Sequence, residues 1–134
     1  MDRSPEYALA LLAKARDDQR MLIVLARAAE SPAWGLGFHA QQAAEKALKA
    51  ALSSRSIRYP RTHDLTALLD LAREHGMALP PDAGLLSALT PFGVEQRYPA
   101  EGPTSLPEGL GVPQLLEVVE GMLAWAQGIC EGTI

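Results

Sequence analysis

Residues 37–52, GFHAQQAAEKALKAAL, constrain the fold of this chain more than any other stretch. Small and apolar side chains recur there at spacings of three, four and seven, the pattern of one broad helical face. That face consists of Ala40, Ala43, Ala44, Ala47, Leu48, Ala51 and Leu52. Because most of them are alanines, a neighbouring helix backbone can come close, and we predict a central helix packed on other helices.

The same predicted helix carries a polar stripe on another face. His39, Gln42, Lys46 and Lys49 follow one another at offsets of three, four and three residues, so they line up along the helix. A helix that packs by one face and presents cations and amides on another borders a polar surface. We therefore predict that this stripe belongs to a binding site.

Length and composition indicate an ordinary globular protein. The 134 residues suit one domain, 1–134, and 48% of them are hydrophobic, enough for a core of side chains alone. The single cysteine, Cys130, makes no internal disulfide, which favours a reducing cytoplasm. The longest apolar runs end at Lys14 and Arg27, too short to span a membrane, and the N-terminus lacks the pattern of a signal peptide.

The net charge of -4 conceals an asymmetry along the chain. Residues 1–64 hold ten Lys and Arg against seven Asp and Glu, whereas residues 65–134 hold two against nine. A mildly basic part of an acidic protein indicates one anionic partner at one place rather than broad coating by nucleic acid. The alternative is that these charges are scattered and solvated.

Periodicity and helix-end signals predict an all-α fold, an antiparallel up-and-down helical bundle. The charged run at residues 14–20 is interpreted as the solvent side of the first helix. No periodic pattern covers residues 92–113, which are rich in glycine and proline. The helices are expected at residues 5–30, from 32 or 33 to 53, at 64–75, at 80–91 and from 112 onward.

Three segments resemble the HEPN family, small helical bundles often encoded beside minimal nucleotidyltransferases. They are FHAQQAAEKALK at residues 38–49, THDL at 62–65 and VEQRYP at 94–99, and their order and separation fit the family over nearly the whole chain. The resemblance implies four long helices plus a short one, frequent homodimers and a role in binding nucleotide or RNA. In several branches it also implies a ribonuclease in a toxin-antitoxin pair.

The ribonuclease branches use an arginine separated by four to six residues from a histidine, late in the chain. Here the late arginine is Arg97, and no histidine follows it. Arg58 and His63 have the required spacing, but they precede the third predicted helix. In a ribonuclease reading, His63 would move the proton of a 2′-hydroxyl and Arg58 would stabilise charge on the phosphate.

The corner that contains His63 has two readings. Thr62, His63 and Asp64 fit the N-terminal cap of the third helix. Alternatively, His63 and Arg61 meet a phosphate or ribose, and the two readings are compatible because a helix N-terminus favours anions. If the polar stripe also faces Arg97 and Tyr98, a cleft with several cations and a stacking ring results; otherwise Tyr98 packs on the core.

Other chemistry has little support in the sequence. No glycine-rich phosphate loop follows a strand, and one cysteine with three dispersed histidines predicts neither a metal site nor a cofactor. Three hypotheses therefore remain. The chain binds a nucleotide or RNA end as the partner of a nucleotidyltransferase, it is a metal-independent ribonuclease, or it is an adaptor without catalytic activity.

Overall fold

The computed structural model of the chain describes residues 5–93 and 103–134, and this part is helical and contains no strand. The all-α prediction is therefore confirmed. In chain order the elements are α1 (Pro5–Arg27), α2 (Ala33–Ser54), α3 (Leu65–Glu74), α4 (Ala83–Leu86), a 3-10 helix η1 (Ser87–Phe92) and α5 (Val112–Glu131).

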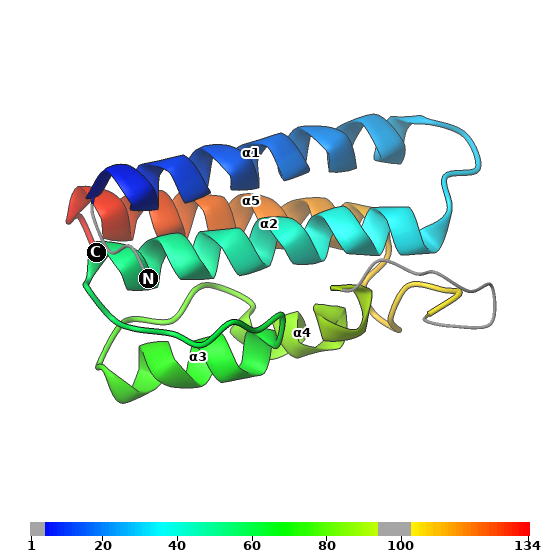
Figure 1. Cartoon of the computed structure of the whole chain (residues 1–134). Helices are drawn as coiled ribbons and strands as arrows, with labels where there is room; N and C mark the ends of the chain where they lie inside the picture. The colour runs from blue at the N-terminus through cyan, green and yellow to red at the C-terminus, as the bar shows by residue number, and fades with distance from the viewer. Residues whose placement is uncertain (1–4, 94–102) are drawn as a thin grey trace.

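The three long helices α1, α2 and α5 lie side by side, and α3 and α4 lie along the free side of α2 (Figure 1). As expected for an antiparallel bundle, α1 runs opposite to both α2 and α5. By contrast, α2, α3 and α5 run in the same direction, because the chain returns through residues 55–64 before α3 and again through residues 75–92, which include α4 and η1, before α5. Other helices and the returning segment therefore surround α2 on most of its sides.

Within residues 5–93 and 103–134 the number of long helices is three rather than four. The expected fourth helix, at residues 80–91, is instead four residues of α-helix followed by six of 3-10 helix. Pro91 lies inside the 3-10 segment, and proline has no N–H to donate to an α-helical ladder. The first helix ends at Arg27, before the predicted position, and Glu30 then adopts a left-handed backbone conformation with φ of 61°.

The predicted alanine face of α2 is the centre of the core. All of its members are fully buried, and α2 packs against α1, α3, η1 and α5. Alanine is what lets α1 approach α2 closely enough for polar side chains from both helices to meet. This close approach positions the site described next.

The N-terminus of α3 is capped as predicted. The Asp64 side chain accepts hydrogen bonds from the backbone N–H groups of Thr66 and Ala67, and the Thr62 hydroxyl accepts one from the Asp64 N–H. This cap fixes the turn that carries His63, so the histidine ring is held against α2.

Candidate functional site

Two buried carboxylates, Asp18 of α1 and Glu45 of α2, organise the polar side of the central helix. Only 8% of Asp18 and 5% of Glu45 is exposed. A buried carboxylate is costly unless its oxygens accept hydrogen bonds, preferably from cations. Each of these two meets that need in the same way, with one lysine and one histidine.

Asp18 joins α1 to α2 through its two oxygens. Oδ1 lies 3.0 Å from Nδ1 of His39, and Oδ2 accepts a hydrogen bond from Nζ of Lys46. The ring of Phe38 packs edge-on against the His39 ring, with 5.3 Å between the ring centroids. His39 and Lys46 of the predicted stripe are therefore both held by one residue of the neighbouring helix.

Glu45 makes the corresponding contacts with α2 itself and with the segment that follows it. One oxygen lies 2.8 Å from Nδ1 of His63 and 3.0 Å from Nε2 of Gln41, and the other lies 2.9 Å from Nζ of Lys49. Gln41 is fully buried and also donates to the backbone carbonyl of His63, at 3.0 Å. Its own oxygen accepts a hydrogen bond from Gln42 at 2.7 Å.

The environment of Glu45 favours the ionised carboxylate. Burial acts to raise the pKa of this group, but hydrogen bonds from Gln41, Lys49 and His63, with the Lys49 charge, outweigh it. The pKa of Glu45 therefore lies below its ordinary value. A charged Glu45 in turn holds Lys49 and His63 in fixed positions.

A hollow of about 420 Å³ lies over the lysines of both pairs. Its walls come from the first turns of α1, from α2 and from the segment that follows α2. Nζ of Lys49 lies 5.8 Å from the centroid of the Tyr59 ring, and the Tyr59 hydroxyl bonds Oγ of Ser53 at 3.0 Å. The lining residues are Tyr7, Leu11, Glu45, Lys46, Lys49, Tyr59, Pro60 and Arg61.

The structure brings part of the predicted set together. Lys46, Lys49 and Arg61 line the hollow, while His39 and His63 are bonded to the two carboxylates and do not line it. Gln42 bonds Gln41, as described above. Arg58 is exposed on the returning segment. The predicted contribution of Arg97 and Tyr98 falls on residues outside the described part of the chain.

The two residues that hold this arrangement, Asp18 and Glu45, were not predicted as site residues. The interpretation of residues 14–20 as a solvated face is wrong for Asp18, which points inward between α1 and α2. Asp17, its neighbour, pairs instead with exposed Arg20 on the same helix. A signal was available for Glu45, four residues before Lys49, but spacing alone does not separate a buried pair from an exposed one.

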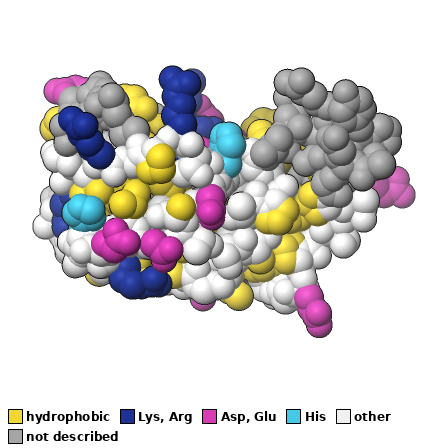
Figure 2. All heavy atoms as spheres, turned by 60° about the horizontal axis from the view of Figure 1, so that its bottom comes forward, with side chains coloured by type: hydrophobic (Ala, Val, Ile, Leu, Met, Phe, Trp, Pro, Cys, Tyr) yellow, Lys and Arg dark blue, Asp and Glu magenta, His cyan; other side chains and the backbone are white. Residues whose placement is uncertain are grey.

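The charged side chains elsewhere on the surface are interspersed. On the face drawn in Figure 2, the described Lys and Arg side chains are separated by acidic and apolar ones and form no continuous basic stripe. Continuous basic stripes are the usual footprint of proteins that coat nucleic acid. This face therefore gives no support for broad coating.

The fold defines the class of the protein as an all-helical bundle domain. The family model described as HEPN domain matches residues 8–129, nearly the whole chain, and the protein belongs to this family. The resemblance drawn from the sequence is thus confirmed. HEPN domains are related to nucleotides and RNA, often as ribonucleases or in toxin-antitoxin systems. Searches of curated proteins and of solved structures gave no match.

Two further features concern only the described part of the chain. None of its helices is both long and apolar enough to cross a membrane. None of its clusters brings together three or more His, Cys, Asp or Glu side chains in a way that could hold a metal ion.

Proposed function

We propose that the hollow between α1, α2 and residues 59–61 binds the phosphate of a nucleotide or of an RNA end. The observation that carries this proposal is the convergence of Lys46, Lys49 and Arg61 on one hollow of about 420 Å³. Apolar and aromatic groups, among them Tyr7 and Tyr59, share its lining and suit a base or ribose. Membership of the HEPN family agrees with a ligand of this kind.

The two lysines are prepared for an anion. An ammonium group has three N–H donors, and the described partner of each lysine, Asp18 or Glu45, uses only part of that capacity. Because the carboxylates already order both lysine side chains, these side chains lose little further conformational entropy when a phosphate binds. Charge-assisted hydrogen bonds from these donors each contribute about 1.5–3 kcal/mol.

The first test is the binding of adenosine 5′-monophosphate. We expect the nucleotide to raise the melting temperature of the protein. We expect Lys49→Gln or Arg61→Gln to raise the dissociation constant about tenfold, since each removes one charged donor. Calorimetric titration measures the constant. Arg73→Gln is the matched control, because Arg73 is exposed on α3 and pairs with Asp70.

The control variant should bind as tightly as the unmodified protein. If neither adenosine monophosphate, other nucleotides nor a 5′-phosphorylated RNA shifts the melting temperature, the proposal is wrong. Equal weakening by Arg73→Gln would show a general charge effect instead of a site.

A second candidate function, metal-independent RNA cleavage, is favoured by the contact between His63 and Glu45. Nδ1 of His63 faces the carboxylate at 2.8 Å, and 57% of the histidine side chain is exposed. A carboxylate that holds one ring nitrogen leaves the other to act as a general base. Arg58, exposed on the same segment, would stabilise the phosphate.

Cleavage of RNA should then be lost in His63→Gln and kept in His75→Gln, which changes an exposed histidine at the end of α3. Circular dichroism of both variants checks the fold. Pure protein that leaves a panel of structured and single-stranded RNAs uncut would end this candidate.

We further propose a cytoplasmic nucleotidyltransferase as partner, in a toxin-antitoxin type of pair, with residues 1–134 acting as one domain. The support is membership of the HEPN family alone. A nucleotidyltransferase encoded in the neighbouring reading frame should co-purify with this protein. If a partner binds but neither nucleotide binding nor RNA cleavage is seen, only the adaptor hypothesis remains.

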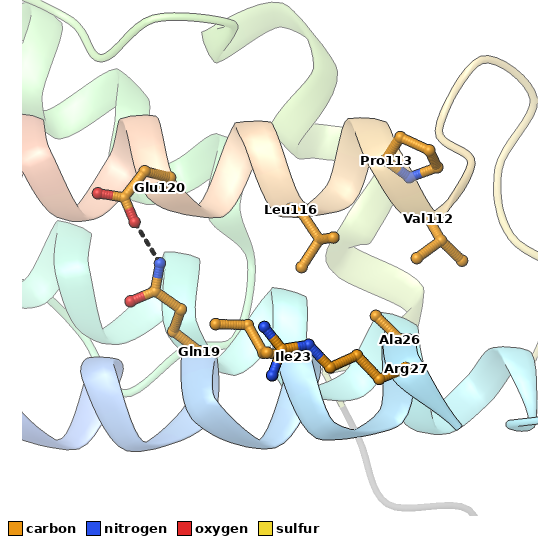
Figure 3. A pocket seen from close by; sticks show the side chains of 8 residues that line it. All are labelled: Gln19, Ile23, Ala26, Arg27, Val112, Pro113, Leu116 and Glu120. Atoms are coloured by element: carbon orange, nitrogen blue, oxygen red, sulfur yellow. Dashed lines mark hydrogen bonds between the residues drawn. The ribbon is translucent and has the colours of Figure 1, made fainter.

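A homodimer is part of the same proposal, and an apolar groove between α1 and α5 is the surface that fits it. The groove encloses about 410 Å³ and is lined by Ile23, Ala26, Val112, Pro113 and Leu116. In Figure 3, the Arg27 side chain extends along the groove and its guanidinium lies beside Ile23, while Glu120, bonded to Gln19, lies at one end. A two-fold axis across the groove would bring Arg27 of each copy to Glu120 of its partner, so the surface is self-complementary in charge.

This arrangement predicts a specific outcome for charge reversal. Arg27→Glu and Glu120→Lys should each give monomers, because each puts like charges opposite one another in both symmetric contacts. A one-to-one mixture of the two variants should dimerise, since every contact is then between opposite charges. Sedimentation velocity measures the three samples. A mixture that stays monomeric while the unmodified protein dimerises would exclude this interface.

A further inference from the structure

The two lysines that line the hollow share an unusual connection. Lys46 is bonded to Asp18, which also bonds His39, and Lys49 is bonded to Glu45, which also bonds His63. In both cases a buried carboxylate lies between a cation that faces the hollow and a histidine that does not line it. The same arrangement of lysine, carboxylate and histidine therefore occurs twice along α2, once with Asp18 of α1 and once with His63 of the following segment.

The charges of this cluster do not match a phosphate dianion while both histidines are neutral. Three cations, Lys46, Lys49 and Arg61, stand against two carboxylates, which leaves one net positive charge. A dianion in the hollow makes the cluster negative overall. Two further positive charges become available if both rings are protonated, and histidine is the side chain that titrates between pH 5 and 8.

We infer that the hollow takes up a phosphate dianion together with protons on His39 and His63. This inference rests on the proposed function of the hollow as a phosphate site. An arriving phosphate shares the ammonium protons of Lys46 and Lys49, so Asp18 and Glu45 lose part of their positive partner. Each carboxylate then favours a charged ring at its other contact.

A neutral imidazole that faces a carboxylate with Nδ1 can donate Nδ1–H to it, and a proton from solvent that adds to the lone pair of Nε2 then gives an imidazolium. The groups that face His39 are Asp18 of α1 and, through it, Lys46. Those that face His63 are Glu45 and Gln41 of α2 and, through Glu45, Lys49, with Arg61 and Asp64 as near neighbours in the chain.

Linkage makes the effect measurable, because a ligand that favours protonation binds more tightly where protons are abundant. Sulfate is the sharper probe, since it stays a dianion throughout the range in which a phosphate monoester itself titrates near pH 6. We expect the dissociation constant of sulfate to fall by about tenfold or more from pH 8 to pH 6. For adenosine monophosphate at pH 7, titrations in two buffers of different ionisation enthalpy should report an uptake of about one proton or more.

The three histidines provide the variants. His39→Gln and His63→Gln should each reduce the proton uptake, and the double variant should abolish it, whereas His75→Gln should leave it unchanged. If the double variant fails to fold, the imidazole resonances of the unmodified protein serve instead. On addition of sulfate at pH 7, the resonances of His39 and His63 should move toward the imidazolium position while those of His75 stay.

The outcomes separate this inference from the function on which it rests. Absence of binding at every pH overturns the phosphate site itself. Binding without proton uptake, or uptake that survives in the double variant, overturns only the coupling. Resonances of His39 and His63 that do not respond to a sulfate concentration that saturates the hollow would do the same.

Discussion

Replacing Glu45 by alanine should lower the free energy of unfolding by about 3 kcal/mol at pH 7, the scale for breaking a buried charged network. The change leaves three groups without their carboxylate partner: the ammonium of Lys49, the amide of buried Gln41 and the ring of His63. The lysine and the amide are largely shielded from water, so solvent replaces little of what is lost. Urea denaturation followed by circular dichroism measures the loss.

Two further variants isolate the cause of that loss. Glu45→Gln keeps the size of the side chain and one acceptor oxygen, so it should cost less than the alanine variant. Glu117→Ala removes an exposed acid from α5 and should change stability by about 0.5 kcal/mol or less. If Glu45→Ala cost no more than Glu117→Ala, the network would contribute nothing to the fold.

The contribution of Glu45 should also disappear in acid. Its pKa lies below the ordinary value in the folded protein, because the three hydrogen bonds and the Lys49 charge outweigh burial. A carboxyl of this kind stabilises the fold above its unfolded pKa, about 4.3, and the stabilisation is lost as the pH falls through the folded pKa. The unmodified protein and Glu45→Gln should therefore differ in urea midpoint at pH 7, and the difference should shrink as the pH falls below about 4.3 and through the folded pKa. A constant difference between pH 7 and pH 3 would contradict this assignment.

The helices of the fold can be predicted from the sequence because they depend on local features, the spacing of residues and the helix caps. Residues 37–52 carry both the alanine face and the polar stripe, and each side of a helix follows directly from residue spacing. The cap at Asp64 is equally local, since it depends on a side chain and the two N–H groups that follow. These features were predicted without knowledge of any other element.

The features that were missed depend on two elements at once. Asp18 becomes a buried acid only because α1 meets α2 at the level of His39 and Lys46, and spacing within α1 does not indicate that level. The direction of α5 relative to α2 is a similar case, because it follows from two return segments, residues 55–64 before α3 and residues 75–92 before α5. The short α4 and η1 differ from the expected helix for a local reason: Pro91, expected to end the helix, lies inside a 3-10 segment that begins at Ser87.

Replacing Gly37 by alanine should destabilise the protein by about 1–3 kcal/mol, the cost typical of an overpacked core. A Cβ at this position would lie 2.2 Å from the ring of Phe92, which is buried where η1 packs on α2. The gain in helix propensity, up to about 1 kcal/mol, offsets only part of this cost.

Gly35, two residues earlier on the same helix, provides the matched comparison for this substitution. A Cβ there would lie 3.6 Å from Leu25, an ordinary contact, so Gly35→Ala should keep the propensity gain and stabilise the protein by up to about 1 kcal/mol. If the two substitutions change the free energy of unfolding in opposite directions, the difference comes from the atoms that each new Cβ meets. Thermal and urea unfolding of both variants measure the signs, and stabilisation by Gly37→Ala would mean that Phe92 does not pack against α2 in solution.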